Sequence, residues 1–255
     1  VTMLAVEVAA TAAAGVALAV VGGLAIGVLL PPLAIVMLRL HQGYNLYNIG
    51  LTSGFLGVLV AAIVTASRGG RLEPGAQWNR EPTLLLVLVV PALCLLLLLG
   101  VLLLRRRGLW GQFVRIMGVS GRLPTDLMEQ AGVAAGLLNM AVLGGLASLY
   151  VLLVGGDFNG PVLGGILTVM GFAAFGKHLR NTWPIAAGVA GATLLFGKGL
   201  ASPGPLLAVL FGTTLAPLAG EFGPLVGLAA GFVHLVMVEQ TAPWHLGMNL
   251  YNNGF

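Results

Sequence analysis

The run Pro82–Leu104, PTLLLVLVVPALCLLLLLGVLLL, decides the fold class of this chain. It contains no charged residue and consists mostly of leucine and valine. About 18 to 20 apolar residues are enough for an α-helix to cross the hydrocarbon core of a bilayer. The strands of a membrane β-barrel, in contrast, alternate apolar and polar residues. The run therefore predicts a transmembrane helix, and its uniform leucine surface favours a peripheral position facing lipid.

The composition extends this conclusion to the whole chain. Of 255 residues, 58% are apolar and only 8% are charged, whereas a soluble domain carries about a quarter charged residues. The 39 glycines suit membrane helices that pack backbone to backbone. No basic run alternates with aromatic residues, so the net charge of +4 does not indicate a nucleic-acid partner. We expect an all-α, polytopic transmembrane bundle in the cell's plasma (inner) membrane, in contact with lipid.

The apolar runs predict about eight helices together with shorter half-helices. They cover residues 1–30, 49–67, 82–104, 131–154, 162–175, 185–196, 206–219 and 224–238. The run 162–175 is short and can be re-entrant, which leaves the parity between the two repeats open, and 185–196 is a short helix. Residues 109–117 form an amphipathic pattern with Trp110 and Phe113 as interface anchors. The loop 105–130 holds five arginines and the loop 68–80 holds three, which puts the former in the cytoplasm.

An internal repeat organises the chain. His41–Gly50 reads HQGYNLYNIG and His245–Gly254 reads HLGMNLYNNG, and Gly23–Leu51 aligns with Gly227–Phe255 without a gap. We expect two related repeats, an arrangement common in transporters. Residues 1–130 hold the first repeat and the cytoplasmic connecting loop, and residues 131–255 hold the second. Of inverted and parallel repeats, the inverted arrangement is the one we favour. Because the last copy stops inside its motif, we also expect the chain to be a fragment, truncated at its N-terminal and C-terminal ends.

The first motif follows an interrupted apolar run. Pro31 and Pro32 donate no backbone hydrogen bond, so they should break or kink the helix that contains them. Residues 33–40 are then too few to cross the bilayer. We expect a broken helix that brings irregular backbone to membrane depth, as in many transporters.

The two motifs are the principal candidate solute-binding site. Asparagine amides and tyrosine hydroxyls both donate and accept hydrogen bonds, so they can replace the water around a small polar solute. The alternative is that the asparagines only cap the helices that follow, and that the histidines bond to backbone instead of binding solute or gating with pH. The candidate residues are His41, Tyr44, Asn45, Tyr47, Asn48, His245, Asn249, Tyr251 and Asn252.

Other polar residues in apolar surroundings have more ordinary interpretations. Lys177 and Asn181 lie in GKHLRNTWP and are candidates for attracting an anion at a pore mouth, or else a positive flank at a helix end. For Asn139 and for Thr213-Thr214 we expect interhelical hydrogen bonds. Asp157, Glu221 and Glu239 are expected at the membrane interface.

The sequence offers no signature of catalysis or of metal binding. It contains neither H-E-x-x-H nor G-x-S-x-G, and its single cysteine, Cys94, lies inside an apolar run. We therefore expect no catalytic residues, no metal and no cofactor, and an enzyme is the less favoured class.

Several motifs resemble an uncharacterised family of bacterial multi-pass membrane proteins. The likeness is carried by both NLYN segments, with Gly160–Gly165 (GPVLGG), Gly171–Asn181 (GFAAFGKHLRN), Pro184 and Gly212–Pro217 (GTTLAP). It implies a multi-pass membrane fold and no particular activity. A weaker likeness at the level of the fold is to urea transporters, which also have two repeats and glycine-tyrosine-asparagine segments; Gly43-Tyr44-Asn45 follows that pattern and Gly247-Met248-Asn249 does not.

These observations favour a channel or secondary transporter for a small polar or anionic solute. Two alternatives stay open: an intramembrane enzyme acting on a lipid or an apolar precursor, with His41, His245 or Glu239 as acid or base, and a non-catalytic membrane scaffold. A coupling ion and a homo-oligomer also stay open as partners.

Overall fold

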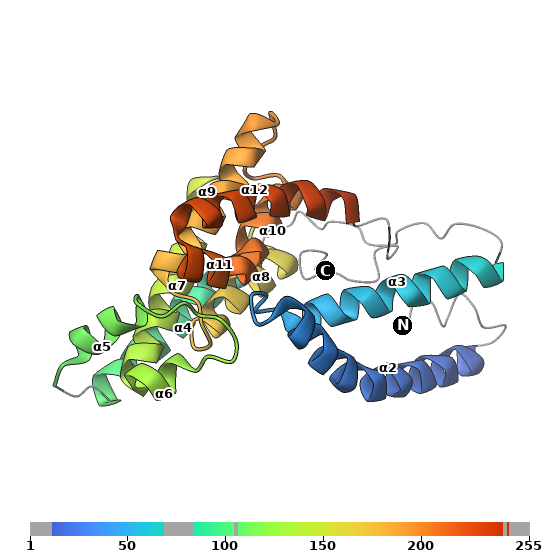
Figure 1. Cartoon of the computed structure of the whole chain (residues 1–255), viewed down its shortest axis with the longest axis horizontal. Coiled ribbons are helices and arrows are strands. Elements are labelled where there is room, and N and C mark those ends of the chain that lie inside the picture. The colour runs from blue at the N-terminus through green and yellow to red at the C-terminus, as the bar shows by residue number, and fades with distance from the viewer. Residues whose placement is uncertain (1–11, 69–83, 105–106, 242–243, 245–255) are drawn as a thin grey trace.

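The computed structural model describes residues 12–68, 84–104, 107–241 and 244, and within these ranges every regular element is helical (Figure 1). The elements are α2 (Ala12–His41), α3 (Asn48–Arg68), α4 (Leu84–Leu104), α5 (Leu109–Ile116), α6 (Leu127–Ala131), α7 (Val133–Leu153), α8 (Gly160–Phe172), α9 (Leu179–Leu195), α10 (Pro203–Gly212), the 3₁₀ turn η1 (Thr213–Leu215), α11 (Ala216–Phe222) and α12 (Pro224–Thr241).

Six helical stretches are long and apolar enough to cross a membrane, by length and composition. They are Ala14–His41, Asn48–Ser67, Val87–Leu104, Val133–Leu153, Pro203–Phe222 and Pro224–Thr241. The all-α membrane fold expected from the apolar runs is therefore confirmed.

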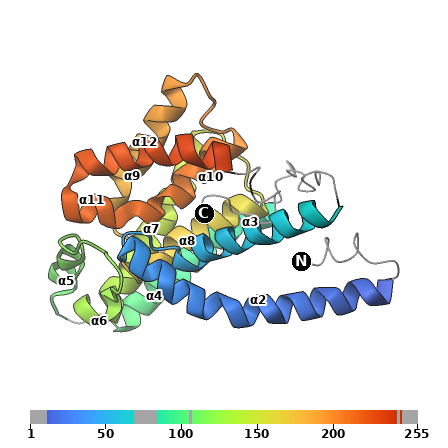
Figure 2. The same cartoon turned by 45° about the vertical axis from the view of Figure 1, so that its right-hand side comes forward.

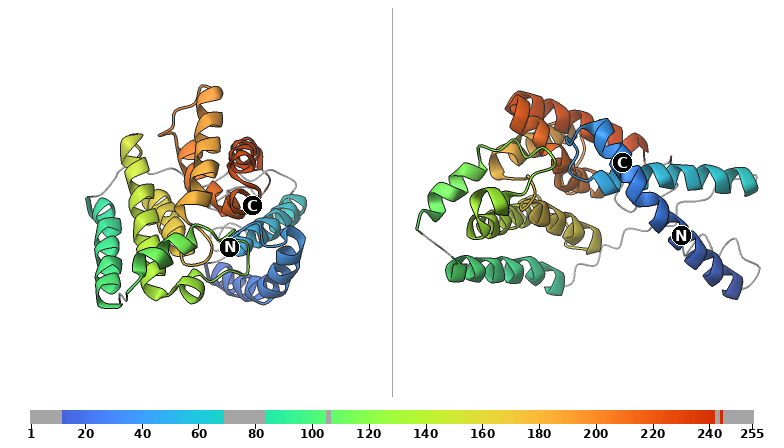
Figure 3. Two further views of the ribbon diagram at one scale, coloured as in Figure 1. Left: turned by 60° about the vertical axis from the view of Figure 1, so that its left-hand side comes forward. Right: turned by 60° about the horizontal axis from the view of Figure 1, so that its bottom comes forward.

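The helices form a body with one projecting hairpin. α2 and α3 lie side by side and extend away from the other helices (Figures 1 and 2). α4 packs on α7 at the edge of the body, which matches the peripheral position expected for the leucine-rich run (Figure 3). The stretch Pro203–Phe222 is central, since 67% of its most apolar window is buried, against 6% for α2.

The core of the body is built around α8 and α10. Ile166 and Leu206 are fully buried there and belong to one apolar cluster with Val151 of α7. α9 and α12 pack against each other through glycines. A Cβ placed on Gly188 would lie 2.1 Å from the Leu228 carbonyl oxygen, and one on Gly231 equally close to that of Ile185. Only glycine permits this backbone approach, as small residues do at membrane helix interfaces.

Of the two outcomes expected at the proline pair, a break or a kink, the break is wrong. α2 continues through Pro31 and Pro32 to His41, and its course bends toward the body (Figures 1 and 2). The two prolines leave the carbonyls of Gly27 and Val28 without their usual helical donors, which bends a helix whose flanking turns stay intact.

The expected helix over 206–219 lies within one helical stretch, Pro203–Phe222, but this stretch is not a single α-helix. α10 ends at Gly212, and η1 separates it from α11. Pro217 cannot donate to the Thr213 carbonyl, which accepts instead from Ala216 in a tighter turn. α9 is longer than the expected helix over 185–196. It begins at Leu179, so Pro184 lies inside it.

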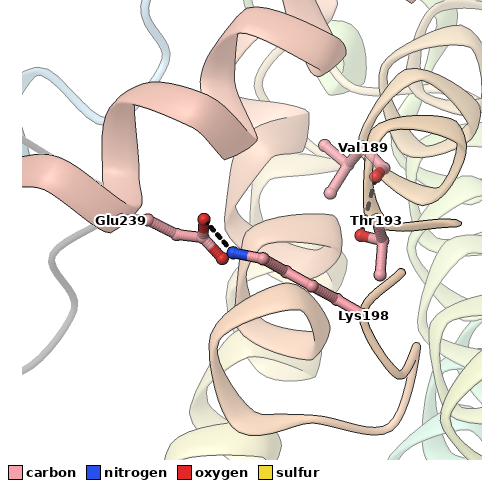
Figure 4. Close-up of polar contacts among 4 residues, drawn as sticks. All are labelled: Val189, Thr193, Lys198 and Glu239. Carbon is pink, nitrogen blue, oxygen red and sulfur yellow. Dashed lines mark hydrogen bonds and ion pairs between the residues drawn. The ribbon is translucent and has the colours of Figure 1, made fainter. Parts of the chain in front are cut away.

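Polar contacts at the periphery hold helix ends together. Lys198, which follows α9, forms an ion pair with Glu239 near the end of α12, as Figure 4 shows. In the same view, the Thr193 hydroxyl donates to the Val189 carbonyl at 2.8 Å, within the last turns of α9. Glu239 therefore binds a surface lysine, and exposed pairs of this kind contribute little stability.

Candidate functional site

The first motif forms the turn between α2 and α3. Gln42 and Gly43 have positive φ angles of 52° and 84°. A Cβ on Gly43 would lie 2.3 Å from the Leu123 carbonyl oxygen, and the Gly43 carbonyl accepts from the Leu123 N–H at 3.0 Å. Glycine is thus required at position 43 for two reasons: the positive φ angle and the close approach of the Leu123 backbone. The motif is pressed against the segment between α5 and α6.

Asn45 fastens this turn to η1. Its side-chain oxygen accepts from the Tyr47 N–H at 2.9 Å and from the Thr214 hydroxyl at 2.5 Å. The Leu46 N–H donates to the Thr214 carbonyl at 3.1 Å. The motif turn therefore docks on the interruption between α10 and α11, and Thr214 makes the interhelical bonds expected of it.

His41 and Asn48 fasten the two ends of the turn to each other. A ring nitrogen of His41, Nε2, lies 2.9 Å from the Asn48 side-chain oxygen. The Asn48 amide donates to the Ala34 carbonyl on α2 at 2.8 Å. Both side chains therefore have partners within the protein, which is the structural role that competes with solute binding. A direct role in binding solute stays a prediction.

Tyr44 and Tyr47 point to different surroundings. Tyr44 lies under the Arg122 guanidinium, 4.4 Å from ring centroid to Cζ, and near Phe222. Tyr47 enters the core, where its ring centroid lies 4.8 Å from that of Phe172 and 6.1 Å from that of Phe211. Only Tyr47 reaches the interior of the body.

Lys177 meets Tyr47 in this interior. Its Nζ donates to the Thr213 hydroxyl oxygen at 2.7 Å and is hydrogen-bonded to the Tyr47 hydroxyl. It also lies 4.3 Å from the Tyr47 ring centroid and 5.7 Å from that of Phe172. The side chain has no exposed surface, and Lys177 is the only buried Lys, Arg, Asp or Glu among the described residues.

Asn139 of α7 holds the backbone around Lys177. Its amide donates to the carbonyls of Ala173 and Lys177, each at 2.7 Å. These carbonyls lie in the interruption between α8 and α9, where helical donors are lacking. The Asn139 side-chain oxygen is buried and has no hydrogen-bond partner. A buried hydrogen-bond acceptor without a donor is unusual. This one belongs to a side chain that is bonded to the backbone of Lys177.

Asn181 and His178 hold the same interruption from its other side. The Asn181 amide donates to the Gly176 carbonyl at 2.9 Å and to that of Ser120 at 3.3 Å. His178 Nε2 donates to the Val119 carbonyl at 2.7 Å, so its buried Nδ1 is unprotonated and has no partner. Burial lowers the pKa of His178 to about 4. Asn181 therefore positions backbone and does not contact the Lys177 amine in this structure.

The electrostatics of the junction are unusual. No carboxylate of the described residues forms an ion pair with Lys177. Lys177 lies between α8 and α9, outside the six candidate spans, and desolvation lowers its pKa well below the ordinary 10.5. Burial likewise raises the pKa of the Tyr47 hydroxyl. Burial therefore disfavours the charged form of both groups, unless an anion lies beside the amine.

An apolar groove reaches the junction from the outer surface of the body. It has a volume of about 220 Å³, lies between α7, α9 and α10, and ends at Thr213. Leu146, Leu179 and Trp183 line it and are exposed. Its wall includes Tyr150, whose buried hydroxyl has no hydrogen-bond partner. An apolar rim of this kind suits contact with lipid chains.

The structure thus brings together three helix interruptions: residues 42–47, 173–178 and 213–215. Tyr47, Lys177 and Thr213 form the centre of this junction, which we call the Lys177 junction. Sequence reasoning singled out Tyr47 and Lys177 separately, but it assigned no role to Phe172 or Phe211. His245, Asn249, Tyr251 and Asn252 lie outside the described residues, so the meeting of the two motifs stays a prediction.

Six apolar helices around a buried polar junction define a multi-pass α-helical membrane protein. Within that class, the chain belongs to a family described as a protein of unknown function (DUF1576), whose model matches residues 1–66 and 106–255. The resemblance to an uncharacterised family is therefore confirmed, whereas the likeness to urea transporters stays a hypothesis. Neither the curated proteins nor the solved structures contain a match to this chain.

Proposed function

We propose that this protein is a channel or secondary transporter of the plasma membrane for a small solute, and that the solute is an anion that binds at the Lys177 junction. The observation that carries the proposal is the burial of Lys177 without a carboxylate partner among the described residues. Ionisable residues inside membrane proteins are costly, and they mark substrate or ion pathways more often than they serve stability.

The chemistry of the junction favours an anion over a neutral solute. A buried ammonium group loses several kcal/mol of hydration, which hydroxyl oxygens and ring faces offset only in part. A bound anion would supply the missing charge. α9 begins at Leu179, two residues after Lys177, so the partly positive end of this helix adds to the attraction.

Convergence of helix interruptions supports the same proposal. Irregular backbone within a membrane body is tolerated where it is buried in protein or lines a cavity, and transporters place substrate sites at such interruptions. The amides of Asn45, Asn139 and Asn181 hold the three interruptions in place. We infer that they set the shape of the pathway, with the second motif completing it.

The first experiment measures solute flux in proteoliposomes that contain the purified protein. The panel comprises nitrate, chloride, methanesulfonate, formate, amino acids, urea and ammonium. We expect flux of at least one anion, lost in Lys177→Met and retained in Lys198→Met, which removes an exposed lysine instead. Flux of urea or ammonium that Lys177→Met leaves intact would contradict an anion site at this junction.

A second variant tests the participation of the motifs. The double substitution Asn45→Ala, Asn249→Ala removes the matching amides of both copies. If the motifs border the pathway, flux falls at least tenfold while the amount of folded protein is preserved. Unchanged flux in a well-folded double variant would limit the pathway to the Lys177 junction.

The apolar groove lined in part by Thr213 favours one alternative function, an intramembrane enzyme. An enzyme acting on a lipid or an apolar precursor would use an apolar cavity at the surface of the body, and this groove is one. Such an enzyme also needs an acid and a base within reach, and the two described candidates have other partners: His41 binds Asn48, and Glu239 binds Lys198. Turnover of lipid extract that is lost in Lys177→Met, without anion flux, would favour the enzyme.

A further inference from the structure

We propose that Lys177 takes up a proton whenever it binds the anion, so that the protein moves one proton together with one monovalent anion. This inference rests on the proposed function and adds the coupling ion and the charge class of the solute. It follows from the hydrogen bonds at the Lys177 junction, which accommodate both protonation states of the amine.

The two hydrogen bonds of the Lys177 amine, to Tyr47 and to Thr213, can be kept with or without the additional proton. The Thr213 hydroxyl donates to the Leu210 carbonyl at 2.7 Å, so its oxygen accepts from Lys177 in either state. The Tyr47 hydroxyl, bonded to Nζ, can accept from an ammonium group or donate to a neutral amine. A proton can therefore arrive or leave without breaking either of these two hydrogen bonds.

The groups that face Lys177 provide no fixed negative charge. Tyr47 comes from the α2–α3 turn, Asn139 from α7, Phe172 from α8 and Thr213 from η1. The neighbouring titratable group, His178, is buried with its Nδ1 unprotonated, so it brings no negative charge either. The described surroundings thus contain one titratable phenol, one neutral imidazole and no carboxylate in contact with the amine.

Anion binding and proton binding must then favour each other. The ammonium form is disfavoured by burial until an anion lies beside it, and the anion is attracted only by the ammonium form. By linkage, each ligand strengthens binding of the other by the same factor. The step adds one proton to Nζ and one anion beside it, and release reverses both without any covalent change. The net charge moved is zero.

The first arm of the test measures binding to the full chain in detergent. Nitrate is the probe, because it stays ionised and does not cross bilayers as a neutral acid. Titration calorimetry at pH 8 in two buffers of different ionisation enthalpy gives the number of protons taken up. We expect about one proton per nitrate bound, and none in Lys177→Arg, whose guanidinium is always charged.

The second arm measures transport in proteoliposomes whose membrane potential is clamped at zero. An inward proton gradient should accumulate nitrate severalfold in the wild type and should not do so in Lys177→Arg. Lys198→Met, which removes a partly exposed lysine outside the Lys177 junction, is the control that should keep both nitrate exchange and its response to the proton gradient. If Lys177→Arg does not fold, the wild-type proton count and the gradient dependence still decide the matter.

The outcomes separate the two proposals. Nitrate that binds or flows without proton uptake, and that responds to membrane potential alone, overturns proton coupling and leaves the anion pathway standing. If a well-folded protein shows no binding and no flux of any anion, the proposed function is overturned, and the proposed coupling is overturned with it.

Discussion

Replacing Lys177 with methionine should make the protein more stable, and the gain should depend on pH. In the folded state, desolvation lowers the pKa of this amine well below the ordinary 10.5 that it has when the chain is unfolded. Between these two values the unfolded chain binds more protons than the folded one, so wild-type stability rises with pH. The slope from one such group is at most about 1.4 kcal/mol per pH unit.

Methionine removes this slope while nearly preserving the volume of the side chain. The apolar surroundings, Phe172 and the ring of Tyr47, accept a thioether readily. The Tyr47 hydroxyl keeps Thr213 as a hydrogen-bond partner, so the loss on that side is about 1 kcal/mol. Stabilisation by Lys177→Met should therefore grow as the pH falls from 10 toward the lowered pKa, by no more than about 1.4 kcal/mol per pH unit, provided no anion is present.

The assay is the free energy of unfolding in mixed micelles, titrated with sodium dodecyl sulfate and followed by circular dichroism from pH 7 to pH 10. Other titrating groups affect both proteins equally, so the difference curve isolates Lys177. Lys198→Met is the matched control, because its ion pair with Glu239 is partly exposed and should contribute less than about 1 kcal/mol. A difference curve for Lys177→Met that is flat over this range would refute the reasoning, since Lys177 would then titrate as a solvated lysine.

Three further substitutions test the Lys177 junction, and the first of them has a matched control. Gly43→Ala should destabilise the protein by more than about 3 kcal/mol, because its Cβ would meet Leu123 backbone; Gly108→Ala, with a similar φ of 87° and open space around it, should cost only about 1 kcal/mol. Equal losses in unfolding titrations would contradict the docking of the motif turn. Asn139→Ala should cost about 2 to 5 kcal/mol, since two buried carbonyls lose their donor, and a neutral result would mean that these carbonyls are hydrated. Thr214→Val, nearly equal in volume, should cost about 1 to 2 kcal/mol in the same assay, and it should do so without abolishing anion binding by calorimetry.

The membrane helices were predictable because their signal is local. Residues 82–104, 131–154 and 224–238 differ from α4, α7 and α12 by only a few residues at each end. Apolar length alone determines such helices in lipid, since no other backbone arrangement satisfies its own hydrogen bonds there. The amphipathic segment 109–117 was equally clear and corresponds to α5.

The interruptions were harder to place because they depend on distant partners. The proline pair predicted a broken helix before the first motif, but it only bends α2. The true interruption at 213–215 is stabilised by the motif turn, more than 160 residues earlier in the chain. The early start of α9 has a similar cause, because Asn181 bonds to His178 at its first turn and to Ser120 on another segment.

The sequence by itself determined that this chain is an α-helical membrane protein, which of its apolar runs are long enough to cross a bilayer, and that Tyr47 and Lys177 are among the polar candidates in apolar surroundings. These properties follow from local hydropathy and composition. Only the tertiary structure decided that the two side chains meet at Thr213, in a core without a described carboxylate. The hydrogen-bond and charge partners of a buried amine are residues that folding brings together from distant parts of the chain. No local sequence pattern shows which residues these are.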